Sequence, residues 1–104
     1  MTEDTKVMKL TILGKYDNYT DFYSFNKTTI YNNIISLFES FKENEKKRLV
    51  LKLSANIENM KWKTDLEFTR EEIYVLKRDI LPYFEELEDY ETCERVVKLC
   101  EIIK

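Results

Sequence analysis

The stretch from Arg48 to Phe68 constrains the fold most, because apolar residues recur in it at every second position. Alternation of this kind predicts strands with one buried and one solvated face. The alternating apolar residues of the two runs are Leu49, Leu51, Leu53, Ala55 and Ile57, then Met60, Trp62, Leu66 and Phe68. Only Thr64 departs from the pattern. The two-residue link Glu58-Asn59 between the runs predicts an antiparallel hairpin.

The amino-terminal part predicts a second hairpin. Val7 to Lys15 alternates in the same way, Tyr16 to Tyr19 resembles a turn, and Thr20 to Phe25 is rich in residues that favour strands. A helix is then expected from Thr29 to Asn44, capped by Asn26 or Thr28. Its buried stripe would be Ile30, Ile34, Leu37, Phe38 and Phe41.

Two helices are expected at the carboxyl end. Thr69 and Glu72 are spaced as a capping box, and Pro82 should kink or restart the helix that follows because it has no N–H to donate. Asp89 is placed to cap the last helix, in which Cys93, Val96 and Cys100 share a face. Because almost no loop joins the two helices, they should form an antiparallel hairpin.

The expected order is therefore ββα-ββαα. Residues 1–104 should form a single α+β domain, with helices packed on one face of an antiparallel sheet and a helical hairpin at the carboxyl end. A chain of 104 residues is long enough to bury a core without disulfides or metals. Glycine and proline occur once each, which predicts few irregular loops.

The composition argues against catalysis. Histidine, the commonest general base and metal ligand, is absent, and one glycine cannot build a phosphate-binding loop. Cys93 and Cys100 lie two helical turns apart, about 10 Å, which is too far for a disulfide and matches no zinc pattern. Carboxylates are abundant but follow the polar helix faces, where solvation explains them. We therefore expect no catalytic residues, no metal and no cofactor.

The expected compartment is the cytoplasm. The amino-terminal residues are polar and lack the apolar region of a secretory signal, and no apolar run approaches the ~20 residues that cross a bilayer. Charge is distributed unevenly: residues 1–64 carry a net charge of +3 and residues 65–104 a net charge of −6. This polarity could orient the protein on a charged partner.

Three surfaces are candidates for partner binding. The first is the expected aromatic hairpin tip, which is rich in a residue type favoured at interfaces; its members are Tyr16, Tyr19, Phe22 and Tyr23. Alternatively, these rings fold down onto the helices. The second is an acidic corner that could imitate a phosphate backbone, or could be a solvated helix end; it comprises Glu85, Glu86, Glu88, Asp89, Glu91 and Glu94.

The third candidate is the open face of the sheet, where Lys9, Lys52, Lys61 and Lys63 should cluster. With aromatic residues nearby, such a face could accept single-stranded nucleic acid. The same lysines could instead keep an exposed sheet soluble. Nucleic acid is the less favoured partner, because the net charge is −3 and no arginine-rich patch is present.

Two resemblances add to this reading. The run Glu88 to Cys93 resembles the core of the UVR motif, a helical hairpin of nucleotide-excision-repair proteins, but Val97-Lys98 stands where that family places Arg-Asp. This departure leaves a helix-hairpin resemblance and no repair function. The small size and the Lys-, Asn-, Ile- and Glu-rich composition resemble accessory proteins of phages with AT-rich genomes, including inhibitors of host defence such as anti-CRISPR proteins.

The leading hypothesis is a non-catalytic phage or mobile-element protein that binds a protein partner stoichiometrically. Its action would be to inhibit a nucleic-acid-binding defence complex of the host, in the host cytoplasm. The alternatives are a virion structural or assembly accessory protein, which would form a homo-oligomer, and a single-strand binder that uses the lysine face. No membrane partner is expected.

Overall fold

The computed structural model describes residues 5–43 and 48–103 of the chain. It contains a strand and a helix, then two strands, then short helical turns and two helices. In chain order these are β1 (Thr5–Tyr16), α1 (Tyr19–Phe38), α2 (Ser40–Glu43), β2 (Arg48–Ile57), β3 (Met60–Thr69), a 3-10 turn (Arg70–Ile73), a π-helical turn (Leu76–Ile80), α3 (Leu81–Glu86) and α4 (Tyr90–Ile102). The α+β class is confirmed. The expected helix end at Asn44 lies outside the described residues.

The central hairpin forms as its alternation predicts. β2 and β3 pair antiparallel in a register that sets Leu53 opposite Thr64 and Ile57 opposite Met60. Glu58 and Asn59 connect them with φ angles of 55° and 62°. Two successive positive φ values define the tight turn whose twist matches that of the flanking strands.

The amino-terminal hairpin is a wrong prediction. Thr20 to Phe25 is helical, since α1 already begins at Tyr19, and β1 pairs with β2 in parallel, with Val7 opposite Val50. The sheet is thus mixed, in the order β1-β2-β3. Parallel neighbours need a long crossover, which the 20-residue helix α1 supplies.

Local hydrogen bonds stabilise the helix that replaces the expected strand. The side chain of Asn18, rather than Asn26 or Thr28, caps α1 by accepting the backbone N–H of Asp21 at 2.8 Å. Asn26 lies inside the helix, where its amide donates to the carbonyl of Phe22 at 2.8 Å. Because Asn26 interrupts the apolar stripe, the period that runs from Phe22 to Ile30 is not visible in the sequence.

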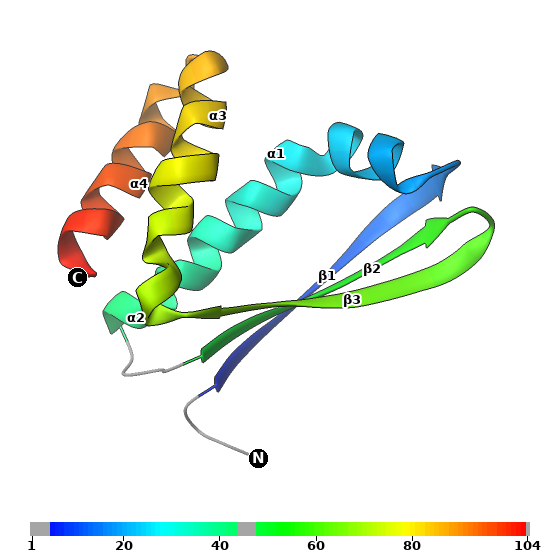
Figure 1. Ribbon diagram of the computed structural model, residues 1–104, viewed down its shortest axis with the longest axis horizontal. Coiled ribbons are helices and arrows are strands. Elements are labelled where there is room, and N and C mark those ends of the chain that lie inside the picture. Colours follow the sequence, from blue (N-terminus) through cyan, green and yellow to red (C-terminus); the bar gives the residue numbers. More distant parts are fainter. Residues whose placement is uncertain (1–4, 44–47, 104) are drawn as a thin grey trace.

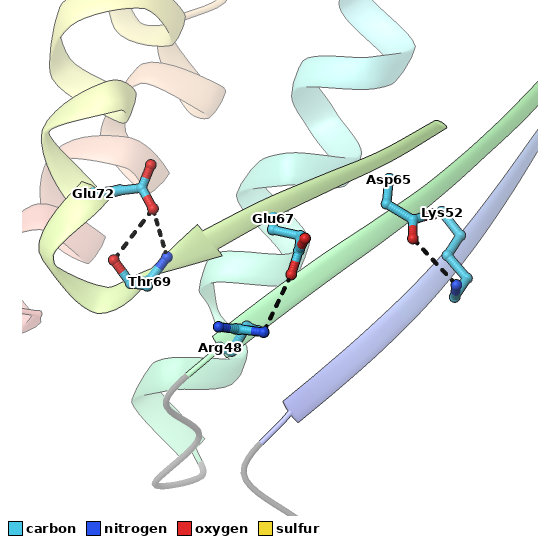
Figure 2. A network of polar contacts seen from close by, with 6 residues as sticks. All are labelled: Arg48, Lys52, Asp65, Glu67, Thr69 and Glu72. Atoms are coloured by element: carbon cyan, nitrogen blue, oxygen red, sulfur yellow. Dashed lines mark hydrogen bonds and ion pairs between the residues drawn. The ribbon is translucent and has the colours of Figure 1, made fainter. Parts of the chain in front are cut away.

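The carboxyl-terminal predictions are confirmed. Glu72 Oε1 accepts the backbone N–H of Thr69 at 2.9 Å and its hydroxyl at 3.2 Å, as Figure 2 shows. Pro82 lies in the first turn of α3, directly after the π-helical turn. Asp89 caps α4 by accepting the N–H of Thr92 at 3.2 Å. Figure 1 shows α3 and α4 side by side and antiparallel.

The core lies on one side of the sheet. Alternate residues of β2, such as Leu51 and Leu53, are buried against Phe22 and Phe38 of α1, and Phe84 of α3 joins the same cluster. In Figure 1, α1 runs between the strands and the pair α3–α4. The described helices therefore cover one face of the sheet, and the opposite face is open to solvent.

Candidate functional site

The open face of the sheet carries the four lysines of the third candidate surface in adjacent rows. Strand pairing sets Lys9 beside Lys52 in one row. The next two rows pair Ser54 with Lys63 and Asn56 with Lys61. Successive residues on one face of a strand are about 7 Å apart, so the lysines form a short ladder along the sheet.

Two shallow hollows lie along this ladder. One has a volume of about 440 Å³ and is lined by Lys9, Lys52 and Lys63 among others. The other has a volume of about 360 Å³ and is lined by residues that include Asn56 and Lys61. Both are bordered by Thr11, Ser54 and Lys63. They therefore adjoin, and together they are called the lysine trough below.

The polar groups of the lysine trough are only partly paired. The hydroxyls of Thr11 and Ser54 are 3.1 Å apart and hydrogen-bond to each other. Lys52 Nζ lies 3.4 Å from Asp65 Oδ2, as drawn in Figure 2, with about half of each side chain exposed. Ion pairs this exposed contribute little to stability. Their cations are therefore available to a ligand.

Asn56 is the unusual group of the lysine trough. Its side-chain oxygen is buried and accepts no hydrogen bond from any residue in the described part of the chain. A buried acceptor without a donor costs free energy, so such groups are rare in folded proteins. Asn56 borders the second hollow, where a ligand with an N–H group could supply the missing donor.

The aromatic rings of the described strands are not free on this face: Trp62 borders the second hollow, but its ring packs against rings of α1. Trp62 and Phe68 alternate with Lys61 and Lys63 along β3 and pack against the core on the opposite side. The expectation that aromatic rings would stack bases beside the lysines is therefore wrong for the described strands. Any ligand of the lysine trough has to be held by charge and hydrogen bonds.

The expected aromatic hairpin residues lie together, although they do not form a hairpin. Tyr16 ends β1, whereas Tyr19, Phe22 and Tyr23 lie in the first turns of α1. Phe22 is fully buried and Tyr16 is half-buried, so these two rings fold inward. Tyr19, Phe22 and Tyr23 each meet Trp62 edge to face, with ring centroids 5.4 to 6.2 Å apart.

Several apolar side chains in the elements at this end of the molecule are exposed. Leu13 is 85% exposed, Phe25 77% and Met60 69%, and the two outer tyrosines, Tyr19 and Tyr23, are 45% and 40% exposed. Figure 1 shows the end of β1, the start of α1 and the β2–β3 turn at one end of the molecule. We call this region, defined by Leu13, Tyr19, Tyr23, Phe25 and Met60, the distal end.

The sequence did not predict every residue of the distal end. Leu13 is exposed because strand alternation places it on the same face of β1 as Lys9 and Thr11, whereas Ile12 is buried. The available signal was thus an apolar residue at a position of the polar face. Phe25 lies in α1 and not in the expected strand. Trp62 lies on the apolar face as expected, and its contacts with Tyr19 and Tyr23 join residues that are far apart in the sequence.

The acidic corner lies at the α3–α4 turn, away from the sheet. Glu85 and Glu86 end α3, and Glu88 links the helices with a φ of 57°. Two members are already engaged: Asp89 caps α4, and Glu94 pairs with Lys98 at 2.9 Å. The remaining carboxylates, Glu85, Glu86, Glu88 and Glu91, are exposed.

The two cysteines are free, with Cys93 buried and Cys100 half-buried. Burial raises the pKa of both thiols above the usual range, and for Cys93 the nearby carboxylates of Glu85 and Asp89 raise it further. Both thiols therefore stay protonated and unreactive at neutral pH. Across residues 5–43 and 48–103, no cluster of three or more potential metal ligands is found, and no helix could span a membrane.

Comparison with known protein families, with curated proteins and with solved structures gave no match.

Proposed function

We propose that this protein acts by binding a protein partner stoichiometrically, without catalysis, and that the distal end is its docking surface. The exposed apolar side chains at that end support the proposal. Leu13, Phe25 and Met60 come from three separate elements, and each leaves most of its side chain in water. Apolar side chains gathered at one site mark interaction surfaces.

The ring cluster at the same end holds two exposed residues of this surface, Tyr19 and Tyr23, in place. Trp62 is held by Tyr19, Phe22 and Tyr23, so the two exposed tyrosines have little rotamer freedom left to lose. Preorganised aromatic residues bind well because little side-chain entropy is lost on docking. Absence of histidine in the sequence favours binding over turnover.

The proposal is tested by affinity capture from the natural host, followed by calorimetric titration with the purified partner. Phe25→Ser should weaken the complex by roughly tenfold or more, as expected for an exposed interface anchor. Ile102→Ser is the matched control, because Ile102 is also exposed but lies at the end of α4. Equal affinities for the two variants would remove the distal end from the proposal.

A narrower form of the proposal is that the protein comes from a phage or mobile element and inhibits a nucleic-acid-binding defence complex of the host. The exposed carboxylates of the acidic corner support this form, because they could occupy sites that otherwise hold phosphates. Glu88→Gly tests it well: the change removes a charge and relieves a positive φ, so weaker binding could not come from a damaged fold.

Asp89 should be left unchanged in these experiments, because its loss would uncap α4. If Glu88→Gly and Glu91→Gln leave the affinity for the captured partner unaltered, the acidic corner is only a solvated helix end. A homo-oligomer in light scattering, with no host protein captured, would contradict the proposal as a whole. That result would favour a virion assembly protein.

A further inference from the structure

We infer that the lysine trough is a second binding site, which adjoins the distal end at Leu13, and that it takes a segment of single-stranded nucleic acid. In this arrangement Lys9, Lys52, Lys61 and Lys63 contact phosphates, and Asn56 accepts a hydrogen bond from a base.

Charge supports the phosphate contacts. Three consecutive rows of the open face carry Lys9 and Lys52, then Lys63, then Lys15 and Lys61, and the single carboxylate among them is Asp65. The next row toward the amino end of β2 pairs Val7, Val50 and Glu67, which ends the basic region. A lysine ladder of this kind matches a linear polyanion better than a compact anion.

The floor of the lysine trough adds neutral donors. Since Thr11 and Ser54 share one hydrogen bond, one of the two hydroxyl protons remains free to donate to a phosphate oxygen. Hydroxyl groups are common phosphate ligands in nucleic-acid complexes. The floor therefore fits an anion that presents oxygen acceptors.

Asn56 favours a ligand that carries N–H donors. Its side-chain oxygen lacks a donor in the described part of the chain, and phosphate and carboxylate groups carry none at neutral pH. The amino and imino groups of nucleobases are donors, and so are the peptide N–H groups of an acidic protein. A base edge can enter a hollow of about 360 Å³ only from an unpaired strand, because a duplex keeps its bases stacked and paired. Among nucleic acids, these observations favour a single strand over a duplex, and the competition experiment below separates a single strand from an acidic protein surface.

The binding should be weak and strongly dependent on salt, because among the described residues the one aromatic side chain that borders the trough, Trp62, is engaged by rings of α1. The test measures the anisotropy of a labelled single-stranded oligonucleotide of about 12 nucleotides, a typical site size, across a range of salt concentrations. Each phosphate contacted contributes about −0.7 to the slope of log affinity against log salt. Four lysines should therefore give a slope of about −3.

Asp65→Asn gives the sharpest prediction, because it should increase affinity. Asp65 is half exposed and pairs with Lys52 at 3.4 Å, so its neutralisation frees a cation and removes a repulsive charge. Binding should tighten about threefold, and the slope should steepen by about 0.7. Glu101→Gln makes the same change of charge on α4 and should leave both quantities unaltered.

Loss of lysines should have the opposite effect. Lys52→Gln combined with Lys63→Gln should weaken binding roughly tenfold at low salt and reduce the slope by about 1.4. Lys77→Gln, an exposed lysine beside α3, is the control. Asn56→Val should weaken binding without changing the slope, because no charge is lost.

Three outcomes would overturn the inference. One is no binding at low salt, and another is equal loss for Lys77→Gln and for the trough variants. The third is competition by polyglutamate as effective as that by unlabelled oligonucleotide, together with unchanged binding by Asn56→Val. That last result would assign the lysine trough to an acidic protein surface.

Discussion

Asn56 illustrates how a single buried atom can link stability and function. Its side-chain oxygen is buried in the open face of the sheet, and no donor for it exists among the described residues. Leaving a buried acceptor unsatisfied costs about 1–3 kcal/mol. Such a group is accounted for where a bound water or a ligand supplies the partner.

Asn56→Val should therefore raise the free energy of unfolding by about 1 kcal/mol, because it replaces an unsatisfied acceptor with a side chain that favours strands. Urea unfolding followed by circular dichroism measures this. Ser54→Val is the comparison: Ser54 lies two residues earlier on the same face, but its hydroxyl is bonded to Thr11. A lower stability for Asn56→Val would show that Asn56 is satisfied in solution.

Glu88 also lowers stability, through its backbone conformation. It connects α3 to α4 with a φ of 57°, a conformation that glycine adopts without strain. Glu88→Gly should stabilise the protein by about 0.5–1 kcal/mol. Glu85→Gly, inside α3, should destabilise it by a similar amount. Thermal denaturation of both variants checks the contrast, and a shift in the same direction would refute it.

At the scale of elements, the features that the sequence predicts are those formed by residues that lie close together in the chain. β2 and β3 were predicted because both the alternation and the two-residue turn are local signals. The bonds around Thr69 and Asp89 were predicted because each cap contacts a residue three positions away. The four trough lysines could be placed on one face because strand alternation decides which face each side chain occupies.

The early start of α1 could not be predicted, because it depends on distant contacts. Thr20 to Phe25 has residues typical of a strand, but Phe22 packs against Trp62 of β3, which is 40 positions away. Tertiary packing overrode local propensity. The distal end and the orphan oxygen of Asn56 depend equally on three-dimensional neighbours, so neither was visible in the pattern of residues.

The cap of α1 can be tested directly. Asn18→Ala should lower the free energy of unfolding by about 1 kcal/mol, because the backbone N–H of Asp21 loses its acceptor. Asn32→Ala, in the middle of α1, should be neutral or slightly stabilising, since alanine favours helices. Chemical denaturation distinguishes the two. Equal effects would mean that α1 does not depend on this cap.

At the scale of the whole molecule, a thin shape exposes one face of the sheet. The principal extents are 41 × 40 × 17 Å, and the described helices cover a single face, as Figure 1 shows. Even so, one cluster of buried residues runs from Phe22 near the distal end to Phe84 and Leu99 in the helical hairpin. The two ends of the molecule are therefore coupled through their packing.

This continuity predicts a single unfolding transition. The fluorescence of Trp62 reports the distal end, whereas circular dichroism at helical wavelengths includes α3 and α4. The two melting curves should coincide, as in a two-state transition. Phe84→Ala should shift both midpoints downward together, since it removes a fully buried ring from the shared cluster. Separate midpoints would show that the helical hairpin unfolds on its own.

The parallel pairing of β1 with β2 also determines when the sheet can begin to form during synthesis. Thr11 of β1 lies beside Ser54 of β2, 43 positions later in the chain. At the usual 5–20 residues per second, a ribosome needs roughly 2–9 s to make that stretch. β1 and then α1 are made within this interval, before the strand that buries them is complete. The nascent chain is therefore most exposed to aggregation, and to capture by chaperones, before β2 emerges.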